Sequence, residues 1–81
     1  MKKSLPPLLD ETEIEAVLLG LPELAEYWRS PAPLLLIRGR ATREDPIYEI
    51  QLAYDLGDRL ETWRWLWVDA IGGKIVRQFP P

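Results

Sequence analysis

The stretch that decides the fold is residues 48–56, which read Tyr48-Glu49-Ile50-Gln51-Leu52-Ala53-Tyr54-Asp55-Leu56. Apolar residues occupy the even positions, and polar residues occupy all but one of the odd positions. Side chains of a strand point alternately to the two faces of a sheet, so this pattern predicts a strand with one buried face.

Turn residues rich in Gly, Pro and Asp separate this strand from three others. The four predicted strands are Leu34–Ala41, Tyr48–Leu56, Leu60–Asp69 and Ile75–Phe79. Short connections join antiparallel neighbours, so the sequence predicts a four-stranded antiparallel meander.

The chain before these strands has a helical period. Asp10 and Glu13 have the spacing of a capping box, which predicts a helix that begins near Glu11. Gly20 and Pro22 interrupt the period, because Gly ends helices and Pro fits only the first helical turn. One apolar stripe runs through both parts: Ile14, Val17, Leu18, Leu21, Leu24, Ala25 and Trp28. The predicted fold class is therefore α+β, with two short N-terminal helices, or one kinked helix, packed on one face of the meander.

Length and composition restrict the domain organisation. The 81 residues, of 9.4 kDa, suffice for one domain, which we expect to span residues 10–81. Residues 1–9 carry two Lys and two Pro without periodicity and are predicted to form a flexible N-terminal arm.

Composition also excludes classes of function. The chain has no Cys and no His, which removes thiolate nucleophiles, imidazole bases and the usual zinc ligands, so we expect neither an enzyme nor a cofactor. A net charge of −3 argues against nucleic-acid binding, because proteins that bind nucleic acids use basic surfaces to contact phosphates. No apolar run approaches the roughly 20 residues of a membrane span.

The N-terminal residues do not form a signal-peptide pattern, so we expect the chain as written to reside in the cytoplasm. If the sequence is a trimmed form of a longer chain, we expect it to be secreted or periplasmic. Eight Pro and no Asn are also typical of some thermophile proteins.

Charged residues offer weaker candidates. Four acids lie near predicted turns, at Asp55, Asp58, Glu61 and Asp69. Their spacing matches no calcium loop, and acids at turns usually cap backbone N–H groups, so we expect no catalytic pair or metal site. Five arginines form a candidate basic edge: Arg38, Arg40, Arg43, Arg64 and Arg77. Their expected partners are Glu44, Asp45, Glu49 and Glu61 on the sheet, the alternative being an acidic ligand or single-stranded nucleic acid.

The acidic charge is concentrated in the helical part. Residues 1–26 hold two Lys against six acids, a net charge of −4, whereas residues 27–81 carry +1. An acidic helix suits attraction of a basic partner, and a simply solvated helix face is the other interpretation.

Three tryptophans alternate in the third predicted strand. Strict alternation places Trp63, Trp65 and Trp67 on one face, opposite the face of Leu66 and Val68. In one interpretation the Trp face packs under the helices, beside the apolar residues of strand 48–56. In the other, Leu66 and Val68 fill the core and the tryptophans form an exposed aromatic ridge suited to a partner.

Two segments resemble the PepSY family. Ile47-Tyr48-Glu49-Ile50 and the stretch from Trp67 through Val68-Asp69-Ala70-Ile71-Gly72-Gly73-Lys74 to Ile75-Val76 are similar to its paired strands and the turn that ends them. Gly72 stands where the family usually has Thr. The helix before the strands also fits, and the architecture is similar to one repeat of β-lactamase inhibitor protein. PepSY domains occur in propeptides of thermolysin-type metallopeptidases and in secreted or membrane-attached bacterial proteins. The resemblance therefore implies a domain that restrains peptidase activity or acts as an interaction module.

The sequence thus predicts a small non-catalytic PepSY-like protein-interaction module, an inhibitor or regulator of a peptidase. Its predicted binding residues are the anchors Trp63, Trp65 and Trp67, with Arg64 and Tyr54 as orienting polar groups. The alternative is a structural or self-assembling homodimer, and an accessory nucleic-acid binder ranks third.

Overall fold

A computed structural model describes residues 6–81 of the chain. The elements are, in order, α1 (Glu11–Gly20), the 3₁₀ turn η1 (Pro22–Leu24), α2 (Ala25–Trp28), β1 (Pro33–Gly39), β2 (Ile47–Asp55), β3 (Leu60–Asp69) and β4 (Ile75–Phe79). The predicted α+β class, with helices before a four-stranded antiparallel sheet, is confirmed.

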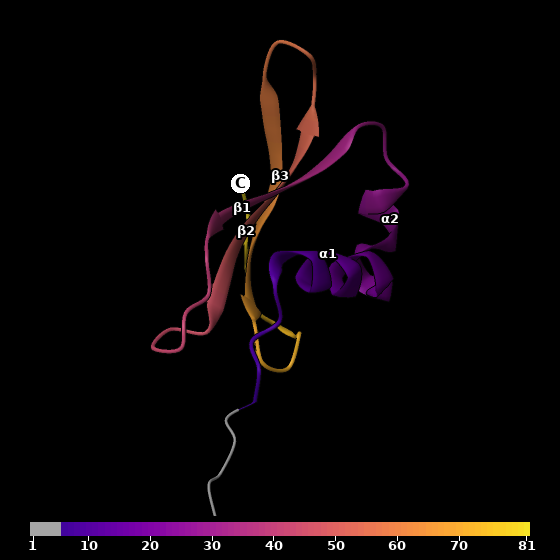
Figure 1. The fold of residues 1–81 in the computed structure, drawn as a ribbon. Coiled ribbons are helices and arrows are strands. Elements are labelled where there is room, and N and C mark those ends of the chain that lie inside the picture. The colour runs from indigo at the N-terminus through magenta and orange to yellow at the C-terminus, as the bar shows by residue number, and fades with distance from the viewer. Residues whose placement is uncertain (1–5) are drawn as a thin grey trace, which may run out of the picture.

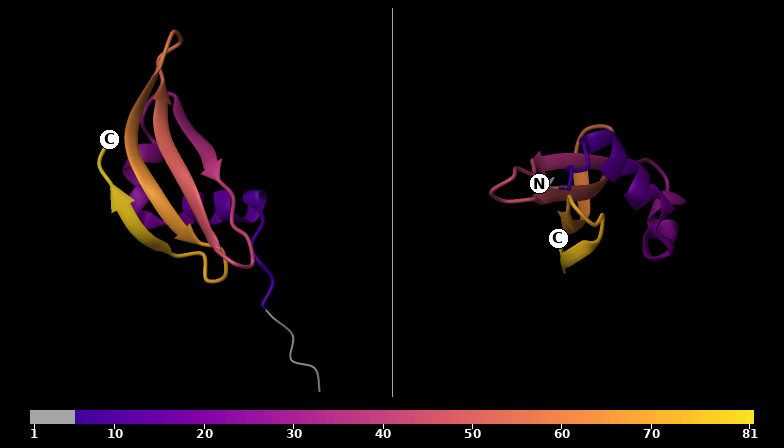
Figure 2. Two further views of the ribbon diagram at one scale, coloured as in Figure 1. Left: turned by 90° about the vertical axis from the view of Figure 1, so that its left-hand side faces the viewer. Right: turned by 60° about the horizontal axis from the view of Figure 1, so that its bottom comes forward.

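The sheet has the order β1-β2-β3-β4, and every neighbouring pair is antiparallel. The helices lie on one face of it (Figure 1). The left view of Figure 2 looks onto the other face, which no helix covers, with β1 and β4 as the free edges. We call this uncovered face the open face.

The helical part follows the predicted breaks. Asp10 and Glu13 form the capping box, each side chain accepting the other residue's backbone N–H. The 3₁₀ turn that starts at Pro22 changes the phase of the apolar stripe, so Ala25 is exposed and Tyr27 takes its place in the core. None of the helices within residues 6–81 is long and apolar enough to cross a membrane.

The core lies between these helices and the sheet. Strand β2 contributes alternate residues, as predicted, although Leu56 follows the end of the strand and is exposed. The central core residues are Ile14, Leu18, Leu24, Tyr27, Tyr48, Ile50, Leu52, Leu66, Val68 and Ala70. Leu66 and Val68 are fully buried, so the even-numbered face of β3 is the one under the helices.

The segment before α1 contacts the sheet. The Leu9 N–H donates to the Ala70 carbonyl at 2.7 Å, and the Tyr48 hydroxyl donates to the Leu9 carbonyl at 2.8 Å. The flexible arm predicted for residues 1–9 falls partly on residues 1–5, which lie outside the described residues. Residues 6–9 are attached by these bonds and by Arg43 Nη1, which donates to the Pro6 carbonyl at 2.6 Å.

The turn between β3 and β4 has the predicted chemistry. The Asp69 carboxylate accepts the N–H groups of Ile71 and Gly72 at 3.0 and 3.1 Å. Gly73 has a φ of +69°, a conformation that L side chains rarely adopt. Asp69 and Gly73 therefore close the turn as the sequence indicated.

Candidate functional site

A β-bulge divides the tryptophans between the two faces of the sheet. Leu52 is paired with Arg64 and Ala53 with Thr62, so Trp63 is an extra residue in β3 without a partner in β2. The extra residue changes the alternation at this point. The prediction that the three tryptophans share one face is therefore wrong for Trp63, which turns toward the helices.

Trp63 packs within an aromatic cluster on the helix side. Its ring is stacked on Tyr27, with centroids 4.7 Å apart, and Tyr54 lies 5.4 Å from the same Tyr27 ring. The Arg64 guanidinium lies 4.3 Å from the centroid of the Trp63 ring, and its Nη1 donates to Gln78 Oε1 at 3.0 Å. Three of the five predicted binding residues, Trp63, Arg64 and Tyr54, thus lie on the side of the helices.

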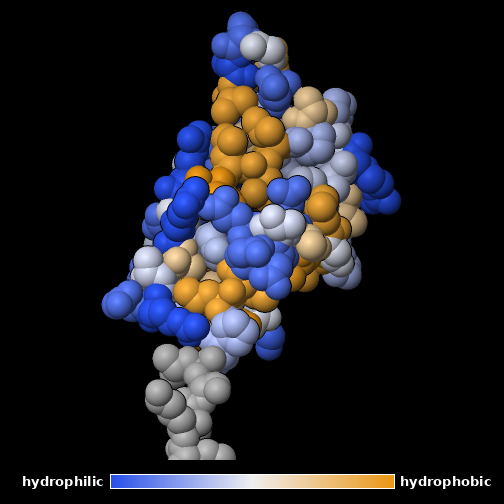
Figure 3. Space-filling model, in the orientation of Figure 1, coloured by the Kyte–Doolittle hydropathy of each residue, from blue (hydrophilic) through white to orange (hydrophobic). Residues whose placement is uncertain are grey.

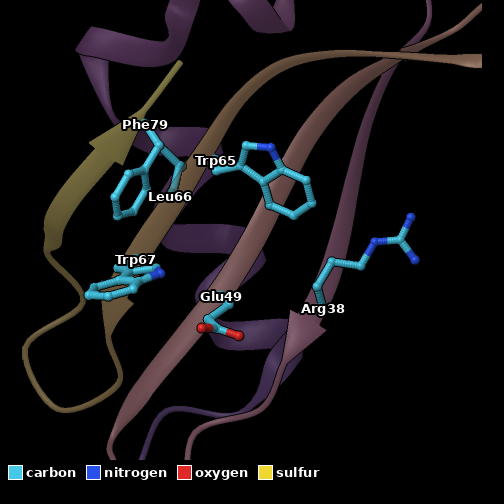
Figure 4. A pocket seen from close by; sticks show the side chains of 6 residues that line it. All are labelled: Arg38, Glu49, Trp65, Leu66, Trp67 and Phe79. Atoms are coloured by element: carbon cyan, nitrogen blue, oxygen red, sulfur yellow. The ribbon is translucent and has the colours of Figure 1, made fainter. Parts of the chain in front are cut away.

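Trp65 and Trp67 remain on the open face. With Phe79 of β4 they line a shallow hollow of about 310 Å³, shown in Figure 4. Its lining residues come from all four strands: Arg38, Glu49, Trp65, Leu66, Trp67 and Phe79. Trp67 is 37% exposed, a large fraction for a tryptophan in the middle of a sheet. The open face therefore presents an aromatic surface to solvent, as the ridge interpretation expected, but with two tryptophans.

Neighbouring side chains hold the exposed aromatic rings in place. Trp67 and Phe79 meet edge to face, with ring centroids 5.1 Å apart. The Arg77 guanidinium lies 5.0 Å from the Phe79 centroid and 5.7 Å from that of Trp67. Contacts of a cation with aromatic rings limit side-chain freedom, so less conformational entropy remains to be lost on binding.

A row of polar side chains crosses the open face beside the tryptophans. Arg38 Nε donates to Gln51 Oε1 at 2.9 Å, and Gln51 Nε2 donates to Thr62 Oγ1 at 2.7 Å. Gln51 is only 7% exposed, so both ends of its amide are bonded within the sheet. Arg38 is thereby held next to the hollow, where Glu49 supplies the opposite charge.

We name Trp65, Trp67, Phe79, Arg38, Arg77 and Glu49 the aromatic site. Sequence reasoning missed Phe79, although the alternation of β4 was a usable signal, because Arg77 pairs with Trp67 and Phe79 with Trp65 across the strands. The bulge at Trp63 leaves no comparable signal in the sequence.

The arginines do not pair as predicted. The ion pair within residues 6–81 joins Arg40 Nε, just after β1, and Glu11 Oε1 of α1 at 2.8 Å. The basic edge is also divided, since Arg38 and Arg77 lie at the aromatic site and Arg64 lies on the helix side.

Two tyrosine hydroxyls have shifted ionisation, both away from the aromatic site. Burial raises the pKa of Tyr27, although hydrogen bonds with the backbone of Leu34 and Ala53 oppose the shift. Burial also raises the pKa of Tyr48, and the nearby carboxylates of Glu11 and Asp10 add to this shift. Both groups stay protonated at neutral pH and serve as hydrogen-bonding groups of the core.

Neither a candidate metal site among the described residues nor a relative of the chain is found. No group of three or more His, Cys, Asp or Glu side chains in residues 6–81 is placed so that it could hold a metal ion. No protein-family model matches the chain, and comparisons with curated proteins and with solved structures find no match. The resemblance to the PepSY family therefore stays a prediction.

Proposed function

We propose that this chain is a small non-catalytic protein-interaction module that binds another protein through the aromatic site on its open face. The observation that carries the proposal is Trp67, 37% exposed beside Trp65 and Phe79 on a sheet face without helices. Aromatic residues and arginine are the residue types most enriched at the centres of protein interfaces.

The site carries charges of both signs, as a protein-binding surface does. Arg38 and Glu49 line the same hollow and have opposite signs. Charges of both signs around an apolar centre complement a protein surface that has its own polar rim. A thermolysin-type metallopeptidase is the first target, because the PepSY resemblance implies it.

The test measures the activity of a thermolysin-type metallopeptidase against increasing amounts of the chain. We expect nearly complete inhibition when the chain and the peptidase are present in equal amounts. The double variant Trp65→Ala, Trp67→Ala should bind the peptidase at least about tenfold more weakly, since interface tryptophans commonly contribute about 2 kcal/mol or more. The matched control is Leu19→Ala, which removes an exposed apolar side chain from α1.

Two outcomes contradict the proposal. Absence of inhibition by the folded chain overturns the peptidase target. Inhibition that the double variant retains but Leu19→Ala loses overturns the open face as the contact surface.

A homodimer through the same face is the second candidate. Arg38 and Glu49 lie on one surface, and a two-fold axis would place the arginine of each copy opposite the glutamate of the other. Sedimentation equilibrium tests it. A mass near twice 9.4 kDa that returns to the monomer value in the double variant supports self-association.

A further inference from the structure

The free edge of the sheet at β1 is a second surface, separate from the aromatic site. We propose that this edge, over Leu35–Ile37, binds an extended basic segment of another protein as an added β-strand. The proposal goes beyond the proposed function, because it concerns a different surface and a different chemistry of recognition.

The backbone N–H and C=O groups of β1 alternate between the side of β2 and the free edge. The Asp55 N–H donates to the Ala32 carbonyl at 3.0 Å, and the register continues with Leu34 opposite Ala53 and Leu36 opposite Gln51. In an antiparallel pair, every second residue directs its N–H and C=O to the neighbour strand. Ala32, Leu34 and Leu36 therefore direct theirs to β2.

The hydroxyl of Tyr27 supports this assignment. It accepts the Leu34 N–H at 3.0 Å and donates to the Ala53 carbonyl, so these two backbone groups face each other between the strands. Leu35 and Ile37 must then direct their N–H and C=O away from the sheet. These four groups have no hydrogen-bond partner elsewhere in residues 6–81.

The open part of the edge is short and apolar. Pro33 has no N–H to donate at one end, and the pairing shifts between Ile37 and Gly39 at the other. Between them the sequence is Leu34-Leu35-Leu36-Ile37, without a charge that would prevent pairing. Figure 3, which faces the β1 edge, shows hydrophobic surface bordered by hydrophilic groups.

The first turns of α1 form the wall of a groove along this edge. A hollow of about 340 Å³ lies between them, lined by Glu11, Thr12, Glu15 and residues Leu35 to Ile37. Asp10 and Glu13 add negative charge to the same end of α1, but their carboxylates accept each other's backbone N–H in the capping box. Among the described residues, Glu11 and Glu15 are the acids that line the hollow, and Arg40 pairs with Glu11, so the carboxylate of Glu15 gives the groove a net negative charge.

The negative charge of the groove determines which partner strand can bind there. A second copy of the chain, paired edge to edge, would bring another acidic α1 to the groove, and like charges in such a contact repel. A basic segment would instead be attracted to the carboxylates of the groove. Since side chains alternate across a strand, its basic residues would lie toward Glu11 and Glu15 and its apolar residues toward Leu36 on the open face.

The experiment uses the full chain and a synthetic peptide of alternating lysine and valine residues. Amide hydrogen exchange, followed by NMR, reports directly on the edge. In the free chain, Leu35 and Ile37 should exchange faster than Leu36, whose N–H is bonded to β2. Saturating peptide should slow the exchange at Leu35 and Ile37 by about tenfold or more and leave Leu36 as the internal reference.

Variants and control peptides separate this site from the aromatic site. Glu15→Lys should weaken peptide binding by roughly tenfold, whereas the matched reversal Glu26→Lys, on α2, and the variant Trp67→Ala should leave it within about twofold. A peptide of alternating glutamate and valine should not bind.

The proposal is overturned if the lysine peptide leaves exchange at Leu35 and Ile37 unchanged, or if the glutamate peptide binds equally well. It is also overturned if both amides are already protected in a chain whose mass is doubled, because a second copy then occupies the edge.

Discussion

The phenol ring of Tyr27 lies nearly parallel to the indole ring of Trp63, with centroids 4.7 Å apart and planes 13° apart. The hydroxyl of the same tyrosine reaches between β1 and β2, where it contacts the backbone of Leu34 and Ala53. One side chain of the short helix α2 thus joins the helices to the sheet, both by packing and by hydrogen bonds. The bulge at Trp63 makes this contact possible, because it turns that indole to the helix side.

Removing the hydroxyl should therefore destabilise the fold. Tyr27→Phe keeps the stacking but leaves the Leu34 N–H and the Ala53 carbonyl without this partner, which costs about 1–3 kcal/mol in the free energy of unfolding. Urea denaturation followed by circular dichroism measures the change. Tyr54→Phe is the matched control, because Tyr54 packs against the same ring and no hydrogen bond of its hydroxyl lies within residues 6–81. Equal losses in both variants would contradict the role of the Tyr27 hydroxyl.

The raised pKa of Tyr27 predicts a specific loss of stability in alkali. The folded state holds the phenolic proton more tightly than the unfolded chain, whose tyrosine titrates near 10.0. The contribution of Tyr27 to the free energy of unfolding should therefore be constant below pH 10. It should be lost as the pH rises from there through the folded-state pKa. Tyr48 has the same direction of shift, so Tyr27→Phe should reduce the alkaline slope without abolishing it. Denaturant unfolding at several pH values measures the slope, and an unchanged slope in Tyr27→Phe would be the contrary result.

The division of the tryptophans predicts unequal effects on stability. Trp63→Ala removes a ring that contacts Tyr27 and the Arg64 guanidinium and should cost about 3 kcal/mol. Trp67→Ala removes a ring that is 37% exposed and packs on Phe79, and it should cost less, about 1–2 kcal/mol. Equilibrium unfolding of the two variants compares them directly. A larger loss from Trp67→Ala would indicate that the open face is covered in the native protein.

The fold was predictable because its signals are local and repeated. The alternation in β2, the capping box at Asp10 and the glycine of the last turn each depend on residues close in sequence. The bulge was not, because it depends on how β3 pairs with β2, and several nearby residues of β3 could equally have been the extra one. A strict period of two, applied through residue 63, therefore placed one tryptophan on the wrong face.

The same limit explains the charged residues. Sequence proximity suggested that Arg40 would pair with acids of the sheet, yet its partner is Glu11, in a helix that the topology brings against the strand. The aromatic site likewise joins Arg38 of β1 to Phe79 of β4, which are far apart in the chain. Which faces are apolar follows from the sequence, whereas the neighbours of a side chain across the sheet follow from the register.

The turn at Gly73 gives a final prediction, in which backbone conformation and packing can be separated. Gly73 and Gly57 both have positive φ, +69° and +91°, so alanine is strained at either position by about 1–2 kcal/mol. A Cβ on Gly57 would meet nothing within 4 Å, whereas one on Gly73 would lie 3.3 Å from Leu9 Cδ1 and 3.5 Å from both Val17 methyl carbons.

Gly73→Ala should therefore lower the free energy of unfolding by more than Gly57→Ala, with the difference measuring how firmly the segment before α1 is held on the turn. Adding Leu9→Ala to Gly73→Ala should remove part of that difference, because the smaller side chain makes room for the new methyl group. A double-mutant cycle by urea denaturation gives the coupling between the two positions. A coupling of zero would mean that Leu9 does not rest on Gly73 in solution, and the contact of the N-terminal segment with this turn would have to be abandoned.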